Sequence, residues 1–419
     1  MSEGDAVVAP AATPLLVDPV VVEVPAHVHQ IEAWPQTVRG GSVDDRTFSE
    51  LRVSLPPLVA RLAPSVPGHL SATMEQALRE IAALDDQHGA HLGSLSTLLL
   101  RAESVASSKI EHVEASIDDY ARAMHGIRAN SSATSMVAST RALDDLIGSV
   151  EGGEPPITRD NILQAHRILM ADDPVERRYA GKVRDMQNWI GGSDHSPRGA
   201  LYVPPPPRTV DGYLTDLLEF ANRQDVNVLA QAAIAHAQFE SIHPFTDGNG
   251  RIGRALVNTI LRRRGTTRRV VVPLASALVA RREDYFGTLS AYRSGNAGPI
   301  IAAFSAASLI ASSEARVTAE RLAVLPEQWR DQAGRPRAGS AAAKLLSRLL
   351  EEPVFSAEDA EARIGGATSS VYAAIARLHE AEIIRPLTNR TRNQIWVAAA
   401  LADELDDLGV RIAALAREA

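Results

Sequence analysis

The sequence predicts a mainly α-helical protein. Aromatic residues make up only 4% of the chain and alanine is abundant, and this composition favours helices over sheets. Apolar residues also recur at three- and four-residue spacing over most of the chain, which is the period of amphipathic helices. With 419 residues, of which 45% are hydrophobic, the chain is long enough for roughly two to four compact units.

The composition excludes several classes of protein. The chain contains no cysteine, so it has neither disulfides nor thiolate metal sites. Its net charge of -8 and pI near 5.9 disfavour a protein whose main work is to grip a nucleic-acid backbone. Prolines and Asp18 interrupt the apolar residues near the N-terminus, and no apolar run reaches the roughly 18 residues of a membrane span. We therefore expect a cytoplasmic protein without a membrane segment.

The first 150 residues are predicted to form an arm and a helical region. Residues 1–45 are rich in Pro, Val and Ala without a helical period, which indicates an extended or disordered arm. Residues 46–150 show helical spacing from Phe48 to Gly126, for example at Met74, Ala77 and Ile81, and predict a helical hairpin or a small bundle.

Residues 151–325 are predicted to form the core that holds the chemistry. An amphipathic helix over 157–169 is followed by two short apolar runs within 183–203, which flank a Gly- and Pro-containing loop. These runs predict a β-hairpin, which Pro204 to Pro207 must close. Helical patterns then resume over 210–222, 228–242, Asn249 to Leu261, and 300–322.

The remaining residues predict a winged helix on a linker. The linker is expected over 326–339, where Gly, Pro and Arg are frequent. Three short helical patterns, 344–350, 356–363 and 369–379, precede two short apolar runs around the polar tip 389–393. This order is the plan of a winged helix over 340–400, and a C-terminal helix is expected over 401–419.

A winged helix commonly binds DNA, but the charges of this one are balanced, because acidic residues match its lysines and arginines. The predicted recognition helix has a single arginine, Arg377, which comes late, whereas base readout needs donors near the helix start. The pattern therefore favours docking of a partner protein or pairing into a homodimer. DNA binding, with Arg390 and Arg392 on phosphate, is the alternative.

The segment HPFTDGNGRIGR, residues 243–254, carries the strongest functional signal in the chain. Arg251 and Arg254 are three residues apart, so both project to one side of the first turn of a helix, where backbone N–H groups already favour an anion. Asp247 can hold Mg²⁺ on phosphates, and His243 is a candidate general base. This combination is suited to nucleotidyl transfer.

Two other interpretations of this segment explain less. Its glycines also match a dinucleotide-binding fingerprint, but the residues before it, AQAAIAHAQFE, are helical where that fingerprint needs a strand. As simple turn pairs, Asp247-Gly248 and Asn249-Gly250 would join two elements. That interpretation leaves His243, Arg251 and Arg254 unexplained.

The same segment resembles the Fic (Fido) motif. It matches each defined position of that motif: His243, Phe245, Asp247, Gly248, Asn249, Gly250, Arg251 and Arg254. The resemblance implies a helical core and transfer of AMP from ATP to a protein hydroxyl. It implies that His243 deprotonates the target Ser, Thr or Tyr, that Asp247 holds Mg²⁺ and that Phe245 anchors the loop. The glycines with Asn249 would cradle the phosphates, and Arg251 and Arg254 would bind the β and γ groups.

The resemblance extends to three further regions. Residues 184–203, within GKVRDMQNWIGG and ALYVPPPP, are similar to the family's flap, which aligns a target segment by strand addition. Tyr285 is expected near the adenine. The stretch from Ser107 to Glu111 resembles an inhibitory helix whose glutamate pairs with Arg254 in place of the γ-phosphate. His112 departs from the Gly or Asn usual at that position, and a solvated helix face is the alternative interpretation of the stretch.

The sequence thus predicts a cytoplasmic, Mg²⁺-dependent protein adenylyltransferase that Glu111 inhibits, with a target protein or the chain itself as acceptor. Two alternatives remain open. One is removal of AMP from modified proteins at the same site, and the other is a DNA-binding regulator that uses the pocket only to sense a nucleotide. The sequence does not predict the target or the modified residue.

Overall fold

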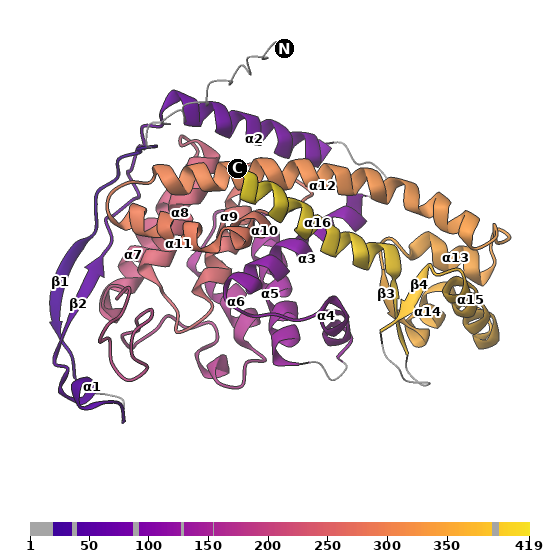
Figure 1. Ribbon diagram of the computed structural model, residues 1–419, viewed down its shortest axis with the longest axis horizontal. Coiled ribbons are helices and arrows are strands. Elements are labelled where there is room, and N and C mark those ends of the chain that lie inside the picture. The colour runs from indigo at the N-terminus through magenta and orange to yellow at the C-terminus, as the bar shows by residue number, and fades with distance from the viewer. Residues whose placement is uncertain (1–19, 36–39, 87–91, 127–129, 154, 388–393) are drawn as a thin grey trace, which may run out of the picture.

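The computed structural model describes residues 20–35, 40–86, 92–126, 130–153, 155–387 and 394–419. Helices form most of these residues, with two small antiparallel sheets (Figure 1). The body contains α1 (Val43–Thr47), α2 (Gly68–Asp86), α3 (Leu92–Ile110), α4 (Ile117–Met124), α5 (Ser131–Gly148), α6 (Arg159–Met170), η1 (Glu176–Tyr179), α7 (Pro207–Ala221), α8 (Val228–Ile242), α9 (Asn249–Arg263), α10 (Ala275–Ala280), α11 (Arg282–Arg293) and α12 (Gly298–Gln332). The C-terminal part contains α13 (Ala341–Arg348), β3 (Val354–Ser356), α14 (Ala357–Ile364), α15 (Thr368–Glu380), β4 (Ile384–Pro386), β5 (Ile395–Ala398) and α16 (Ala399–Glu418).

Helices α8 and α9 pack against each other at the centre of the body (Figure 1). Every residue of α8 is buried, and most of them are apolar. Helix α9 is buried from Asn249 to Leu261. Helices α7, α11 and α12 cover α8, while α3, α5 and α6 cover α9. The loop that joins α8 to α9 is therefore held at both ends by the most deeply buried helices of the fold.

The N-terminal part differs from the sequence-based prediction. Residues 28–33 form β1 (Val28–Ala33), which pairs in antiparallel register with β2 (Glu50–Leu55). The prediction of helix from Phe48 onward is wrong at β2, and helices after this ribbon begin at Gly68. Before β1, Val24 donates its backbone N–H to the Gly295 carbonyl, so this part of the arm is attached to the body. Residues 1–19 lie outside the described chain.

The prediction of a regular β-hairpin at 183–203 is also wrong. A single bridge joins Ile190 to Tyr202, and the rest of the segment is irregular. Gly191 and Gly192 both have positive φ, which turns the chain directly after the bridge. Prolines from 204 onward supply no N–H groups to extend a ladder. The segment instead lies against the ribbon, where Ser54 donates its N–H to the carbonyl of Val203 over 2.8 Å.

Helix α12 connects the body to the C-terminal part. It continues through Pro326 to Gln332, so the first half of the predicted linker is helical. By length and hydropathy α12 could cross a membrane, but half of its most apolar window is buried among other helices. The C-terminal part adds a strand, β3, to the predicted elements, in a sheet of order β3-β5-β4. The predicted tip at 389–393 lies outside the described residues.

Helix α16 returns from the C-terminal part along α12 to the body (Figure 1). A buried cluster fixes it there: Glu404 accepts hydrogen bonds from Thr318, Arg321 and Arg411. Arg411 also pairs with Glu314 over 2.8 Å. All three partners from the other helix, Thr318, Arg321 and Glu314, belong to α12. Ion pairs and hydrogen bonds therefore hold α16 on α12 in addition to apolar packing.

Candidate active site

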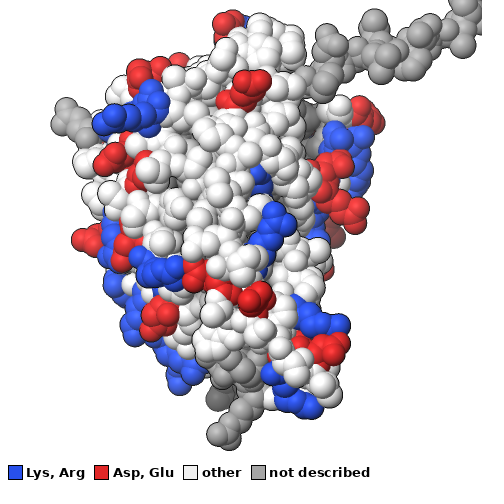
Figure 2. Space-filling view, turned by 90° about the vertical axis from the view of Figure 1, so that its left-hand side faces the viewer, with Lys and Arg blue, Asp and Glu red and all other residues white. Residues whose placement is uncertain are grey.

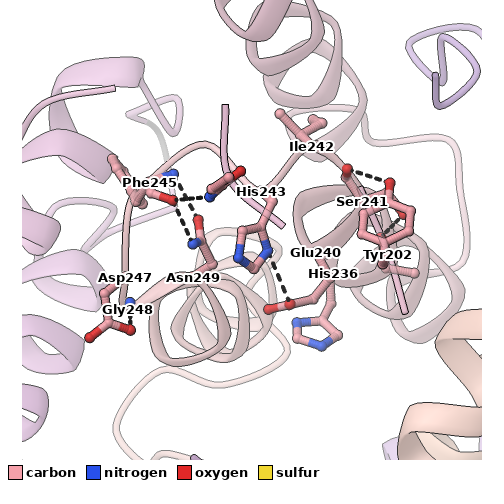
Figure 3. Close-up of polar contacts among 12 residues, drawn as sticks. Tyr202, His236, Glu240, Ser241, Ile242, His243, Phe245, Asp247, Gly248 and Asn249 are labelled. Carbon is pink, nitrogen blue, oxygen red and sulfur yellow. Dashed lines mark hydrogen bonds and ion pairs between the residues drawn. The ribbon is translucent and has the colours of Figure 1, made fainter. Parts of the chain in front are cut away.

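His243 occupies a constrained position at the end of α8. Its backbone is left-handed, with φ of 51° and ψ of 62°, a conformation that a residue with a β-carbon rarely adopts. Its N–H still donates to the carbonyl of Phe239, while its own carbonyl accepts from Nε of Arg184 over 2.8 Å. The helix therefore stops at His243, and the imidazole faces the side chain of Glu240 (Figure 3).

The imidazole of His243 is neutral at physiological pH. Burial lowers its pKa to about 3, and the positive charges of Arg184 and Arg293 act in the same direction. A neutral imidazole has one nitrogen free to accept a proton, which a general base requires. The side chain keeps 16% of its surface exposed, so the base remains accessible.

Side-chain contacts fix the loop between α8 and α9. Phe245 is fully buried and its ring stacks on His166 of α6, with centroids 3.7 Å apart. Asn249 closes the loop, because its amide accepts from the Phe245 N–H and donates to the Phe245 carbonyl. The Asn249 side chain therefore has a structural role: it holds the two ends of the loop together through hydrogen bonds to the Phe245 backbone. His166 also donates from Nε2 to the Asp247 carbonyl, since its Nδ1 accepts from Gly181.

The start of α9 is built to receive an anion. Gly248 has φ of +77° and caps the helix without a side chain, so N–H groups of the first turn are not covered by a capping oxygen. Arg251 is 6% exposed and binds Ser135 through one terminal nitrogen. Asp247 has its side chain 56% exposed and lies 3.5 Å from Arg251. Two buried arginines and one exposed carboxylate thus lie around the N-terminus of α9.

Arg254, the second arginine, is held by the end of α3. It is 1% exposed, and it donates to Oγ and the carbonyl of Ser107 over 2.8 and 2.9 Å. A third hydrogen bond of 2.8 Å goes to Oε1 of Glu111. Burial opposes the charge of Glu111, but Arg254 outweighs burial and holds the pKa of this carboxyl below its usual value. A β-carbon at Gly250 would collide with Glu111, so the carboxylate lies directly over the start of α9.

The turn that carries Glu111 has an unusual cap. Helix α3 ends at Ile110, and His112 has φ of +58°. The N–H of Val113 bonds back to the Ser108 carbonyl, as in a helix end that normally uses glycine. Histidine at this position is strained where glycine is not.

Tyr285 lies behind Arg254. It is 2% exposed, and its hydroxyl is 2.8 Å from Nε2 of His236 and 3.4 Å from the Arg254 guanidinium. The structure therefore places Tyr285 at the guanidinium side of the site. Its predicted proximity to adenine stays a prediction.

Several residues that organise the site were not identified from the sequence. Arg184 is 3% exposed, and besides His243 it binds the carbonyl of Pro205 over 2.6 Å. Tyr202 donates to the Ser241 carbonyl (Figure 3), and Asn188 donates to that of Phe245. These contacts tie segment 184–203 to the catalytic loop. Side chains that bind distant backbone carbonyls leave no periodic signal in a sequence, so only the fold reveals them.

Comparison with known proteins identifies the domain that this site occupies. The family model described as Fic/DOC family matches residues 156–261, which run from just before α6 to the last turn of α9. The chain contains a Fic/DOC-family domain. The expected resemblance is thereby confirmed.

Relatives and solved structures agree with this assignment. The chain is 33% identical over 179 residues to protein adenylyltransferase fic-1 of Caenorhabditis briggsae. The aligned residues cover 42% of this chain and 31% of that protein. It is 29% identical over 210 residues to a probable protein adenylyltransferase of Aquifex aeolicus, covering 48% and 57% of the two. A Fic family protein from Desulfovibrio desulfuricans shares the fold, with a TM-score of 0.50 at 20% identity over 80% of this chain and 97% of that one. The chain therefore spans about a third to a little over half of these curated relatives.

Proposed function

We propose that this protein is a protein adenylyltransferase that transfers AMP from ATP to a Ser, Thr or Tyr hydroxyl. The observation that carries the proposal is the convergence of a neutral buried imidazole, a helix N-terminus and two buried guanidiniums on one loop. In the transfer, the target oxygen bonds to the α-phosphorus, the bond from that phosphorus to the bridging oxygen breaks, and pyrophosphate leaves with the electron pair. The names of the relatives support the same reaction.

The polar residues His243, Asp247, Arg251 and Arg254 each have a part in this reaction. His243 takes the hydroxyl proton, and the N–H groups at the start of α9 with Arg251 and Arg254 hold the phosphates. Asp247 fits Mg²⁺, because its carboxylate is exposed and magnesium usually takes one or two carboxylates together with phosphates and water. Among the described residues no group of three or more His, Asp or Glu side chains forms a protein-only metal cage. Bound Mg²⁺ would neutralise charge on the phosphates.

The proposal includes inhibition by Glu111. The Arg254 donors that would hold the γ-phosphate are bound to Ser107 and Glu111. A carboxylate and a phosphate compete for the same guanidinium, and only one of them can occupy it. Activation therefore requires Glu111 to leave Arg254.

The target is proposed to dock as an extended segment at 184–203. Leu201 is 85% exposed beside an open groove of about 540 Å³ between β2 and residues 197–203. Ile31 of β1, 60% exposed, lies along the same groove. In Figure 2 the upper part of this face shows few charged side chains, and a band of acidic and basic side chains crosses it below. These features suit an extended segment with apolar side chains.

For the C-terminal part we propose a winged helix that docks a protein. The single arginine of α15, Arg377, donates to the carbonyls of Ala333 and Gly334 and so is used within the chain. Arg363 and Arg385 are paired with Glu352 and Asp118. These three arginines are thus engaged within the chain, which argues against a nucleic-acid surface.

The experiment that tests the function compares wild type, Glu111→Gly and Glu111→Gly/His243→Ala, each with Mg²⁺ and ATP labelled on the α- or the γ-phosphate. Protein-bound label is expected from the α position only, strongest in Glu111→Gly and absent in the double variant. Label from the γ position would show a kinase-like reaction instead. No label from either position in Glu111→Gly would contradict the proposal.

A further inference from the structure

Glu240 is a buried carboxyl group next to the general base. It lies on the last turn of α8, three residues before His243, and is 7% exposed. Its Oε2 lies 4.0 Å from Nδ1 of His243, and the two side chains face each other (Figure 3). Oε1 of Glu240 has no hydrogen-bond partner, whereas the His243 ring also interacts with the backbone carbonyl of Glu240. Buried polar atoms without partners are costly and are uncommon away from functional sites.

The space around Glu240 depends on Gly253. A β-carbon at that position would come within 3.1 Å of Oε1 of Glu240. This is tighter than ordinary packing, so glycine leaves the carboxyl group room beside α9. The charged and titratable groups that face Glu240 come from four helices or their ends: His236 and His243 of α8, Glu111 after α3, Arg254 of α9, and Tyr285 and Arg293 of α11.

We propose that Glu240 is a positioning residue for the base: its carboxyl group keeps a proton on Nδ1 of His243, so that Nε2 is free to accept the proton of the target hydroxyl. This inference rests on the proposed function. During transfer, the hydroxyl proton moves to Nε2 and the ring becomes an imidazolium ion. The Glu240 carboxylate, next to the Nδ1–H, stabilises that ion and orients the ring.

The same geometry gives Glu111 a second effect. Burial raises the pKa of Glu240 to about 7, the negative charge of Glu111 acts in the same direction, and Arg254 and Arg293 oppose it. When Glu111 leaves, this repulsion is lost and the pKa of Glu240 falls. The charged carboxylate, which is the form that assists His243, is then favoured. Glu111 thus acts on the base as well as on the phosphate-binding arginine.

The kinetic test places Glu240→Gln in the Glu111→Gly background. We expect kcat to fall at least about tenfold, the usual scale for a group that assists a base, while the KM for ATP is unchanged. The fall in rate on the acid side of the pH profile, which reports protonation of Glu240, should disappear. Glu240→Asp, which keeps a carboxylate, should recover part of the rate. Glu219→Gln, the same chemical change on the exposed side of α7, is the matched control and should leave the profile as it was.

An NMR measurement tests the positioning without relying on catalysis. In protein labelled with ¹⁵N-histidine, the His243 signals are assigned by their loss in His243→Ala. We expect the Nδ1–H tautomer in Glu111→Gly and a shift away from it in Glu111→Gly/Glu240→Gln. The positioning role is overturned if the tautomer does not change, or if Glu240→Gln raises the KM for ATP and leaves kcat and the pH profile intact. A tautomer shift without any AMP transfer would instead reject the proposed function and keep the positioning.

Discussion

At the residue scale, Arg254 is the group on which binding and inhibition converge. Its guanidinium is almost completely buried, so it requires a partner whether or not a nucleotide is present. Glu111 supplies the negative partner in this structure. A γ-phosphate offers the same charge with more acceptor oxygens, and the exchange therefore leaves no buried charge unpaired.

The strained cap after Glu111 gives a prediction. His112→Gly relieves a left-handed conformation at an exposed position, so we expect the free energy of unfolding to rise by about 1 kcal/mol. A more stable turn keeps Glu111 on Arg254 for more of the time. Basal self-modification should therefore fall when this single change is made in the wild-type protein. Thermal unfolding and labelling from α-labelled ATP measure the two effects.

Glu382→Gly is the matched control for His112→Gly. Glu382 has the same positive φ of 58°, but it lies in the C-terminal part after α15. Its replacement should stabilise the protein similarly and leave basal labelling unchanged. If both variants lowered labelling equally, the effect would come from general stability and not from the turn.

At the element scale, the catalytic loop is fixed by a segment that has little regular structure of its own. Residues 184–203 contribute one β-bridge, yet Arg184, Asn188 and Tyr202 bind carbonyls at the end of α8 and the start of the loop. The hydrophobic pattern indicated two short strands but could not show this attachment. The bounds of α8 and α9 were predicted to within a few residues. The helical pattern there is long, stops at His243-Pro244 and resumes after Asn249-Gly250, so both helix ends are marked in the sequence.

Arg184 provides the prediction at this scale. Arg184→Met removes the donors to the His243 and Pro205 carbonyls and leaves buried acceptors unpaired, at a cost of about 1–3 kcal/mol. In the Glu111→Gly background we expect kcat to fall more than the affinity for ATP, since the base loses its backbone support. Loss of the positive charge should also raise the pKa of His243.

Arg198→Met serves as the control for Arg184→Met. Arg198 belongs to the same segment, but its side chain is half exposed and pairs with Asp44 at the surface. Its replacement should change neither kcat nor the melting temperature appreciably. Equal losses in the two variants would contradict a specific role for Arg184.

At the scale of the whole molecule, the inhibitory turn lies between the catalytic core and the C-terminal part. Helix α4 begins six residues after Glu111, and apolar and polar contacts join it to the C-terminal part. Arg122 donates to the Leu387 carbonyl over 2.8 Å, and Asp118 pairs with Arg385 over 2.9 Å. A partner that displaces the C-terminal part from α4 would therefore loosen the chain next to Glu111.

This arrangement predicts that Arg385→Ala raises basal self-modification while Glu111 is intact. The pair is partly exposed, so its contribution is below about 1 kcal/mol and the rise should be at most about fivefold. Adding Arg385→Ala to Glu111→Gly should give no further increase, because inhibition by Glu111 is already absent. Arg159→Ala, which breaks a comparably exposed pair with Asp211 between α6 and α7, should leave basal labelling unchanged. A rise in the control, or an added rise in the Glu111→Gly background, would contradict the coupling.

The sequence by itself determined the helical class, the central helix–loop–helix and the identity of the residues around the candidate base. These features depend on local periodicity and on residue types in a short stretch, both of which a sequence displays directly. Only the tertiary structure decided the β1–β2 ribbon, the irregular course of 184–203 and the continuation of α12 through Pro326. It alone placed Glu240 beside His243 and α4 beside the C-terminal part. Those contacts depend on burial and on pairing between distant segments, whose free energies exceed local propensity and leave no local signal in the chain.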